Sequence, residues 1–293
     1  MLRRYLNLKG TSVRTRRTYV SALALGAGLC LVAGSAQAFD AQNSVGPGPS
    51  AERFSAPIEN PVVDGDRPQG KIRSFFKFGF SAYKSGKKQE AFELYTKSAE
   101  EGHIGARWAL ANMYASGDGV PEDDFEAFKL FRGIANEGAA QGSRESSYVA
   151  GALVALGNYL QIGIPQSPVK SNPVLARDIY WQAAINYGDP NAQYMLGKMF
   201  LNGEAGNVDR QQAARWFNLS AKKGHAGARA MLGQMMFDAG KTVEGIGMMT
   251  AALELAHPND RQWIRKMQEQ AFALSDEQER RTGISLSARY LPQ

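Results

Sequence analysis

The sequence predicts an all-α protein, a right-handed solenoid of stacked helix pairs. Two observations support this fold class. From about residue 71 onward, Ala, Leu, Met and aromatic residues recur at spacings of three and four, the period of a helix that buries one face. The same order of small and bulky residues then returns along the chain, as in Ala91 and Ala127. A recurring helical unit of this kind cannot bury its apolar face alone, so neighbouring units are expected to stack.

Residues 1–38 are predicted to be a signal peptide that directs export. They contain six basic residues and no acidic one, then an apolar run from about Tyr19 to Ala33, and they end in Ala36-Gln37-Ala38. These are the three parts of a secretory signal, so we expect cleavage between Ala38 and Phe39 and a periplasmic mature chain. The apolar run is shorter than the roughly 20 residues of a membrane helix, so stable membrane insertion of the mature chain is not expected. Thr15–Val20 resembles a twin-arginine signal loosely, and an ordinary basic region is the favoured alternative.

The excess positive charge of the chain belongs to this leader. The whole chain has 34 basic and 28 acidic residues, and removal of the leader's six basic residues leaves the two signs equal. A nucleic-acid-binding protein needs a basic surface, so that class is excluded. The single cysteine, Cys30, also lies in the leader. Because Leu29 stands where a lipoprotein signal needs a small residue, Cys30 is not expected to carry a lipid.

The remainder divides into three parts. Residues 39–70 are rich in Pro, Gly, Ser and charge and are expected to form a flexible N-terminal arm. Residues 71–257 are the predicted repeat domain, and residues 258–293 are predicted to be charged capping helices and a tail. A solenoid needs such an atypical end to cover its last apolar face.

Each repeat has two halves with their own pattern. The first half has a small residue, then a Leu, then a Gly or Ala directly after the Leu, and finally a large residue. Its copies are Ala106-Leu110-Ala111-Tyr114, Ala152-Leu156-Gly157-Leu160, Ala192-Leu196-Gly197-Phe200 and Ala228-Leu232-Gly233-Met236. An irregular first copy is Ser74-Phe78-Gly79-Ala82. The second half has Ala, two bulky residues, Ala and a final Gly; its clearest copies are Ala91-Leu94-Tyr95-Ala99-Gly102, Ala127-Leu130-Phe131-Ala135-Gly138 and Ala213-Trp216-Phe217-Ala221-Gly224. Small residues at fixed places let two helices approach closely.

Helix ends are also marked. The final glycine of each second half suits a left-handed helix stop. Asp189-Pro190 and Asn172-Pro173 pair a capping side chain with proline at the first helical position. The pairs Asp123/Glu126, Asp209/Gln212 and Ser275/Gln278 have the spacing of a capping box.

Two loops between paired helices carry a further motif, which is typical of a known family. Gly117-Asp118-Gly119-Val120-Pro121-Glu122-Asp123 precedes Ala127, and Gly203-Glu204-Ala205-Gly206-Asn207-Val208-Asp209 precedes Ala213. With the flanking repeats, the chain resembles the Sel-one-like repeat (SLR) proteins, relatives of the tetratricopeptide repeat. The unit between Ala152 and Gly188 departs from that pattern, because its loop carries Pro165 and Pro168 and lacks the Gly-x-Gly-Val motif.

No motif for catalysis, for a cofactor or for a metal is present, so we expect no enzyme. The acids crowded around Asp118 and Asp123 do not have EF-hand spacing and are interpreted as helix caps and solvated charge. His103, His225 and His257 recur at one repeat position. The favoured interpretation places each histidine near a helix C-terminus, where positive charge is favourable. A metal cluster or a pH sensor is the alternative.

Protein binding is the remaining function. If the repeat Leu points to the core, the residue two further on lies about 200° round the helix, on the inner wall of the solenoid. These residues are Asn112, Asn158, Lys198 and Gln234, and Trp108 and Tyr194, two before the Leu, are expected to border the same wall. A solvated wall without a partner is the alternative.

The leader, the arm and the cysteine-free repeats resemble the ExoR-type regulators of bacterial exopolysaccharide synthesis. That resemblance implies a periplasmic repressor bound to the periplasmic domain of a membrane sensor histidine kinase of a two-component system. It also implies control through a periplasmic protease. Two alternatives stay open: a structural scaffold of an envelope polysaccharide-export complex, and a β-lactam-binding SLR hydrolase, although this chain lacks the repeated cysteines of the latter group.

Overall fold

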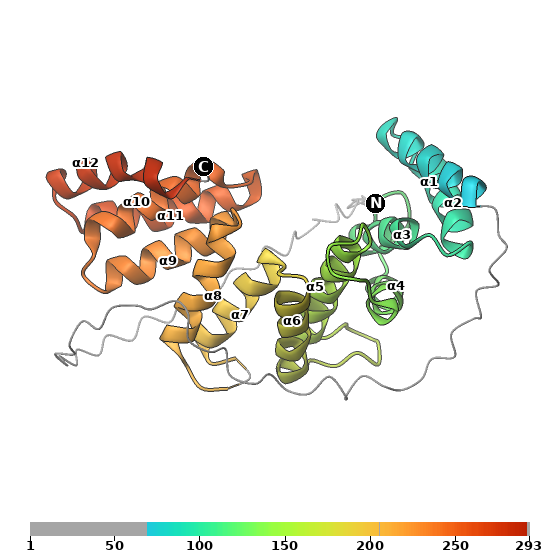
Figure 1. The fold of residues 1–293 in the computed structure, drawn as a ribbon, viewed down its shortest axis with the longest axis horizontal. Coiled ribbons are helices and arrows are strands. Elements are labelled where there is room, and N and C mark those ends of the chain that lie inside the picture. The colour runs from blue at the N-terminus through green and yellow to red at the C-terminus, as the bar shows by residue number, and fades with distance from the viewer. Residues whose placement is uncertain (1–68, 205, 292–293) are drawn as a thin grey trace, which may run out of the picture. The chain divides into compact units, whose positions relative to one another are not determined.

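The computed structural model describes residues 69–204 and 206–291, and within these residues all regular structure is helical (Figure 1). The expected signal peptide and nearly all of the expected arm lie outside the described residues. Ten helices form five successive hairpins: α1 (Gln69–Lys84) with α2 (Lys88–Glu100), α3 (Ile104–Ser116) with α4 (Asp124–Glu137), α5 (Ser146–Ile162) with α6 (Pro173–Asn186), α7 (Pro190–Asn202) with α8 (Arg210–Lys222), and α9 (Ala226–Asp238) with α10 (Thr242–Leu255). The predicted all-α solenoid of helix pairs is therefore confirmed.

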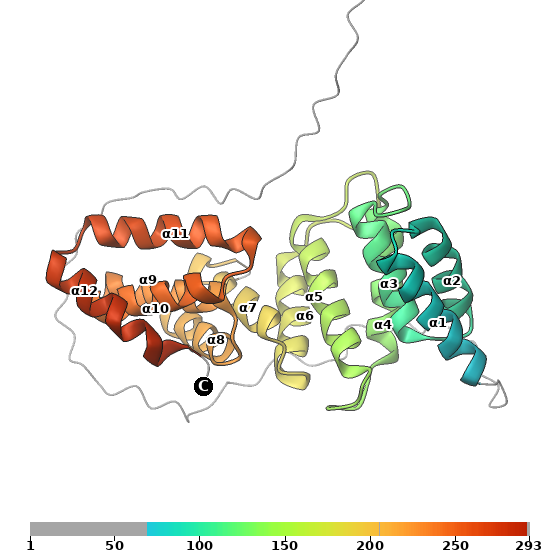
Figure 2. The ribbon, with the colours of Figure 1, turned by 90° about the horizontal axis from the view of Figure 1, so that it is seen from above.

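Each helix packs against the next one along the chain, within a hairpin and between hairpins (Figure 2). The apolar core consequently follows the stack, and the bulky residues of the second helices form its centre. Tyr180 and Phe217 are fully buried, and Tyr95, Phe131 and Trp216 are nearly so. These side chains are packing residues, as the helical spacing predicted.

In four of the five first helices a glycine lies where the paired second helix crosses, and in α3 the position is Ala111. A methyl group on Gly197 would lie 2.6 Å from the ring of Phe217, and one on Gly157 would overlap Tyr180. At Gly233 the obstacle is backbone, because the added carbon would lie 2.9 Å from the carbonyl oxygen of Gly245. The predicted role of small residues in close helix approach is confirmed.

The predicted helix ends are confirmed at most positions. Gly102, Gly138, Gly188 and Gly224 follow second helices with positive φ angles between 63° and 91°, the region that glycine adopts at least cost. The carboxylates of Asp123, Asp189 and Asp209 and the amide oxygen of Asn172 each accept a backbone N–H of the first helical turn.

The predicted capping box of Ser275 and Gln278 is wrong by one residue. Asp276 begins α12 (Glu277–Leu286), and its carboxylate accepts the N–H of Glu279, whose own carboxylate accepts the N–H of Asp276. Ser275 is buried and instead donates its hydroxyl to the carbonyl of Ala271 in the preceding helix. Both registers fit the sequence, and the carboxylate wins because it stays solvated while it caps.

The irregular unit keeps its hairpin through its proline-containing loop. The N–H of Asn172 donates to the carbonyl of Leu160 at 2.6 Å, and the N–H of Ile164 donates to the carbonyl of Val169 at 2.9 Å. Ile164 and Val169 are buried in the main core cluster. The loop therefore closes by inserting two apolar side chains, in place of the Gly-x-Gly-Val turn.

The C-terminal end of the stack is covered. Helix α11 (Pro258–Ala273) packs on α9 and α10, and α12 with the short 3-10 helix η2 (Ser287–Tyr290) packs on α10. Gly283 of α12 lies directly against Ile246 of α10. Within the described part of the chain, no helix has the length and apolar character that crossing a bilayer requires.

Candidate protein-binding face

The six predicted contact residues occupy two repeat positions one helical turn apart on the first helices. Asn112, Asn158, Lys198 and Gln234 lie two residues after the repeat Leu, and Trp108 and Tyr194 lie two before it. Positions separated by four residues share one side of a helix. The structure therefore places these residues on a common strip along the first helices, which we call the first-helix face.

The polar members of this face differ in how freely they project. Asn112 is exposed and donates its amide to the carbonyl of Trp108 at 2.7 Å. Asn158 is exposed, and its amide oxygen accepts the hydroxyl of Tyr180 at 2.7 Å. Lys198 and Gln234 are half-buried, with the ammonium group of Lys198 5.8 Å from the ring centre of Tyr194. Asn112 thus keeps its amide oxygen, and Asn158 its amide N–H groups, for a bound chain.

The two aromatic members pack on their own hairpin and on the next repeat. Trp108 is half-buried, contacts Phe131 edge-on with ring centres 5.3 Å apart, and covers Gly151 of α5. Tyr194 stacks on His225 with ring centres 4.5 Å apart, and burial, followed by the charge of Asp260, raises the pKa of Tyr194 to about 12. Both rings hold neighbouring first helices together and leave only part of their surface at the face.

Two of the three histidines, His103 and His225, serve as helix caps, which differs from the expected charge interaction. Nδ1 of His225 accepts the N–H of Ala228 at 3.0 Å at the start of α9, and Nδ1 of His103 accepts the N–H of Ala106 at 3.2 Å at the start of α3. Burial lowers the pKa of His225, which favours the neutral ring that this acceptor role requires. The sequence signal was present, since an acceptor side chain three residues before a helical N–H is the capping pattern.

The sequence reasoning missed Phe80, the member that the first unit contributes to this face. Phe78 stands at the repeat Leu position of α1, so Phe80 is the equivalent of Asn112 and Asn158. Its side chain is 52% exposed, and the ammonium group of Lys84 lies 5.5 Å from its ring centre. Extending the spacing rule to the irregular first repeat identifies it. An exposed aromatic ring beside a lysine adds an apolar anchor to an otherwise polar face.

Two polar networks, also unforeseen, tie non-adjacent helices together. The hydroxyl of Tyr83 in α1 donates to Asp118, just after α3, and Lys88 of α2 lies 3.1 Å from the same carboxylate. The hydrogen bond from Tyr83, followed by that from Lys88, lowers the pKa of Asp118. In the second network, the amide of Gln161 in α5 donates to Glu204, just after α7, at 2.6 Å.

These networks occupy matching repeat positions. Tyr83 and Gln161 lie five residues after the repeat Leu position, and Asp118 and Glu204 lie eight after it in the following unit. Asp118, which was predicted to be solvated, and Glu204 thus fix the spacing of first helices. No cluster of three or more His, Cys, Asp or Glu side chains able to hold a metal occurs within 69–204 and 206–291. The arrangement presents a fixed surface of amides, a lysine and an aromatic ring, which is suited to recognition of another chain.

Two curated relatives match most of the sequence. The chain is 44% identical over 280 residues to an exopolysaccharide production negative regulator of Rhizobium meliloti (strain 1021), and the match covers 96% of both chains. It is 50% identical over 212 residues to a protein of the same description from Rhizobium leguminosarum bv. viciae, covering 72% of this chain and 79% of that relative. The chain belongs to this family of negative regulators.

The repeats of this family member are Sel1 repeats. The Sel1 repeat model matches residues 80–103, 104–138 and 190–225, and it leaves out residues 139–189, the unit predicted to depart from the pattern. Asp118 and Glu204 fall in two of these matched segments. A solved Sel1 repeat protein from Oxalobacter formigenes is 19% identical, covers 75% of this chain and 88% of that chain, and gives a TM-score of 0.55, a likeness of fold alone. Helix-pair repeats of this type present surfaces for protein–protein interaction.

Proposed function

We propose that this chain is a periplasmic protein-binding regulator that represses a membrane sensor histidine kinase, and that it thereby lowers exopolysaccharide synthesis. The observation that carries the proposal is the match over 96% of both chains to a relative described as a negative regulator of exopolysaccharide production. The signal-like leader supports a periplasmic site of action. The proposed activity is binding and not catalysis, with no cofactor, and a periplasmic protease is the proposed means of removing the regulator.

The first-helix face is the proposed contact for the kinase's periplasmic domain. The exposed amides of Asn112 and Asn158 can bond a partner's backbone, and the exposed ring of Phe80 can enter an apolar pocket on it. Because these groups stand on successive units held by the hydrogen bond of Tyr83 to Asp118 and by the packing of Trp108 on α5, they form a preorganised surface that costs little to order on binding.

Exchange of Asn112, Asn158 and Lys198 for alanine, together with Phe80→Ser, tests the binding face. We expect the purified variant to keep its helicity, because these side chains are exposed or half-buried. Loss of one buried aromatic anchor alone weakens binding by about tenfold, so capture of the kinase's periplasmic domain should fall at least that far. Surface-immobilised capture of that domain measures the change.

Phe78→Ser is the matched control, because Phe78 is also an exposed phenylalanine of α1 and, two residues before Phe80, points away from this face. Capture by the control should equal that of the parent chain. Equal capture by the parent and the quadruple variant would rule out the proposed face.

Crosslinking in intact cells, followed by mass spectrometry of the captured protein, tests the identity of the partner. Recovery of no sensor kinase would count against the proposal.

A further inference from the structure

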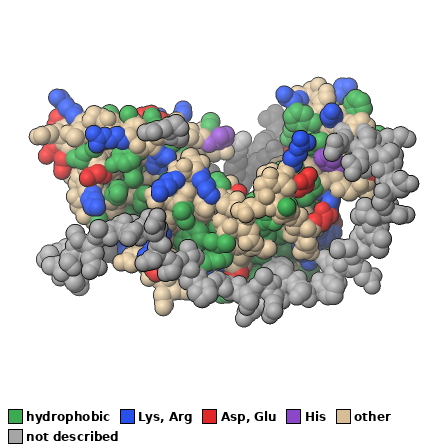
Figure 3. Space-filling model, in the orientation of Figure 1, with side chains coloured by type: hydrophobic (Ala, Val, Ile, Leu, Met, Phe, Trp, Pro, Cys, Tyr) green, Lys and Arg blue, Asp and Glu red, His purple; other side chains and the backbone are tan. Residues whose placement is uncertain are grey.

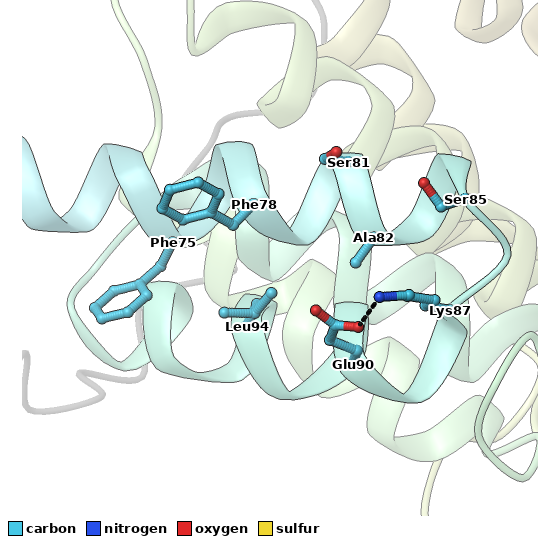
Figure 4. A pocket seen from close by; sticks show the side chains of 8 residues that line it. All are labelled: Phe75, Phe78, Ser81, Ala82, Ser85, Lys87, Glu90 and Leu94. Carbon is cyan, nitrogen blue, oxygen red and sulfur yellow. Dashed lines mark ion pairs between the residues drawn. The ribbon is translucent and has the colours of Figure 1, made fainter.

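The N-terminal end of the repeat stack carries an open apolar groove. Its walls are α1 and α2, and its volume is about 330 Å³. Phe75, Phe78, Ala82 and Leu94 form the apolar part of the lining, and a 3.2 Å ion pair between Lys87 and Glu90 closes one end (Figure 4). Hydrophobic and basic side chains lie side by side over this end of the molecule (Figure 3).

The repeat shows that this groove is half of an interface between units. Phe78 is 61% exposed, whereas the residues at the same position of the later units are 0–9% exposed; these are Leu110, Leu156, Leu196 and Leu232. Each of those leucines is covered by the second helix of the preceding unit, as Leu110 is by Ala91 and Tyr95 of α2. Leu94 is likewise the counterpart of Trp216, which packs on Trp181 of the unit before it. In the described residues no unit precedes α1, so the groove has the shape of an interface without its partner.

Charge indicates what covers it. Residues 69–100, which include both walls of the groove, contain seven basic and three acidic residues, although the chain without its leader is balanced. Residues 52–66, directly upstream, contain four acids and one arginine. They also carry Phe54, Ile58 and Val62 at spacings of four, with Pro57 and Pro61 immediately before the latter two. An acidic segment with regularly spaced apolar side chains complements an apolar groove on a helix pair of net positive charge, and its prolines reduce the entropy lost on docking.

We propose that residues 52–66 of this chain, which lie outside the described residues, dock in the α1–α2 groove and complete the N-terminal end of the stack. The connection is long enough. Val62 and Gln69 are seven positions apart, a span of up to about 23 Å, whereas Phe78 lies about 14 Å along α1 from its start. A second copy of the chain fits less well, because two such ends would bring like charges together. Attachment in the same chain also supplies an effective concentration of about a millimolar.

A disulfide-trapping experiment on the full exported chain tests this proposal. Cys30, the single cysteine of the sequence, lies in the predicted leader, so introduced pairs are the only thiols of the processed chain, and Cys30→Ser removes the last thiol from any unprocessed chain. The test pair is Ser55→Cys with Ser81→Cys, since Ser81 lines the groove. The control pair is Ser55→Cys with Phe80→Cys, because Phe80 is adjacent to Ser81 but lies outside the groove. We expect an intramolecular disulfide in the test pair at least about tenfold faster than in the control, given the effective concentration of a docked segment.

Two further variants identify the groove as the cause. Added to the test pair, Phe78→Ser should slow disulfide formation by about tenfold, because it removes the main apolar contact. Phe80→Ser should leave the rate unchanged. Equal rates of disulfide formation in the two cysteine pairs overturn the proposal. The absence of any disulfide also overturns it, because residues 52–66 would then not occupy the groove and another protein could bind there. Covalent dimers whose yield rises with concentration would show a second copy in the groove and would also overturn it. None of these readouts involves the kinase, so this result and the proposed function stand or fall separately.

Discussion

At the N-terminal end of the described chain, Phe78 is 61% exposed; near the C-terminal end, the equivalent Leu232 is 9% exposed. Both residues belong to the same repeat pattern and to the same position of a first helix. The difference is that Leu232 receives the preceding second helix α8, whereas the described residues hold no helix before α1. Beyond the last hairpin, α11, α12 and η2 cover α9 and α10.

The two ends show which contacts the repeat pattern specifies and which contacts the terminal units need in addition. A hairpin specifies its own contact and one contact to each neighbour, so every internal unit is satisfied by the pattern alone. The terminal units each keep one unfilled surface, and the residues that fill it follow no repeat. The helices that cover the C-terminal end accordingly make contacts that no repeat contains, such as the packing of Gly283 on Ile246 and the capping box of Asp276.

The largest predicted difference between the ends concerns the glycines of the first helices. Gly233→Leu should destabilise the chain by more than ~3 kcal/mol, because the new side chain meets the backbone of Gly245, which cannot turn aside. Gly79→Leu should cost only ~1–2 kcal/mol, because it meets the ring of Tyr95, and the adjacent groove leaves that helix pair room to shift. Denaturant unfolding measures both, and equal losses would refute the difference in rigidity.

The next largest effect concerns the repeat leucine position itself. Leu232→Ala should cost ~2–3 kcal/mol, because it opens a cavity against Phe217. Phe78→Ala should cost at most ~1 kcal/mol, because the ring is mostly in solvent and only docking of the upstream segment is lost. A thermal melt of each variant is sufficient. A loss at Phe78 as large as that at Leu232 would mean that this end is covered as tightly as an internal unit.

The smallest effect is a pH dependence that should appear at an internal unit and not at the C-terminal cap. Because burial lowers the pKa of His225, the unfolded chain takes up a proton at a higher pH than the folded chain. The stabilising contribution is complete above the unfolded pKa of about 6.5, and it is lost as pH falls toward the lower folded pKa.

His225→Asn keeps a capping acceptor that does not titrate, so this variant should lose less stability between pH 7.5 and 5 than the parent chain. His257 is exposed and makes no side-chain cap bond to α11, so His257→Asn should follow the parent chain. Melting temperatures across this pH range measure both variants. Identical pH profiles for the parent and His225→Asn would show that another group carries the dependence.

The internal architecture could be predicted from the sequence because packing at each unit repeats. Gly157, Gly197 and Gly233 identified the helix crossings, and Asp123, Asn172 and Asp209 identified helix starts. These signals are local, since a crossing needs a small residue and a cap needs an acceptor three residues before an N–H. The register error at Ser275 arose because a serine and an aspartate both meet that local requirement.

The polar contacts could not be predicted in the same way, because they join residues far apart in the chain. Tyr83 and Asp118 are 35 residues apart, and Gln161 and Glu204 are 43 apart. Which side chain reaches which depends on how successive hairpins are rotated, and small-residue spacing does not fix that rotation. The positions of Asn112 and Asn158 on one face followed from helical geometry, whereas Phe80 was missed because the first repeat is irregular, and the packing of Trp108 and Tyr194 onto the next unit did not follow from it either.

Helix α10 is in contact with α9, α11, α12 and η2, and α9 is in contact with α7, α8, α10 and α11; no other helix of the described chain contacts as many elements. In a linear array, a segment held from several sides opens only when its neighbours have opened first. Amide hydrogen exchange should therefore be slowest in α9 and α10 and become faster toward α1. Loss of structure would start at α1 and proceed along the array, so that a partly opened chain would retain its C-terminal half.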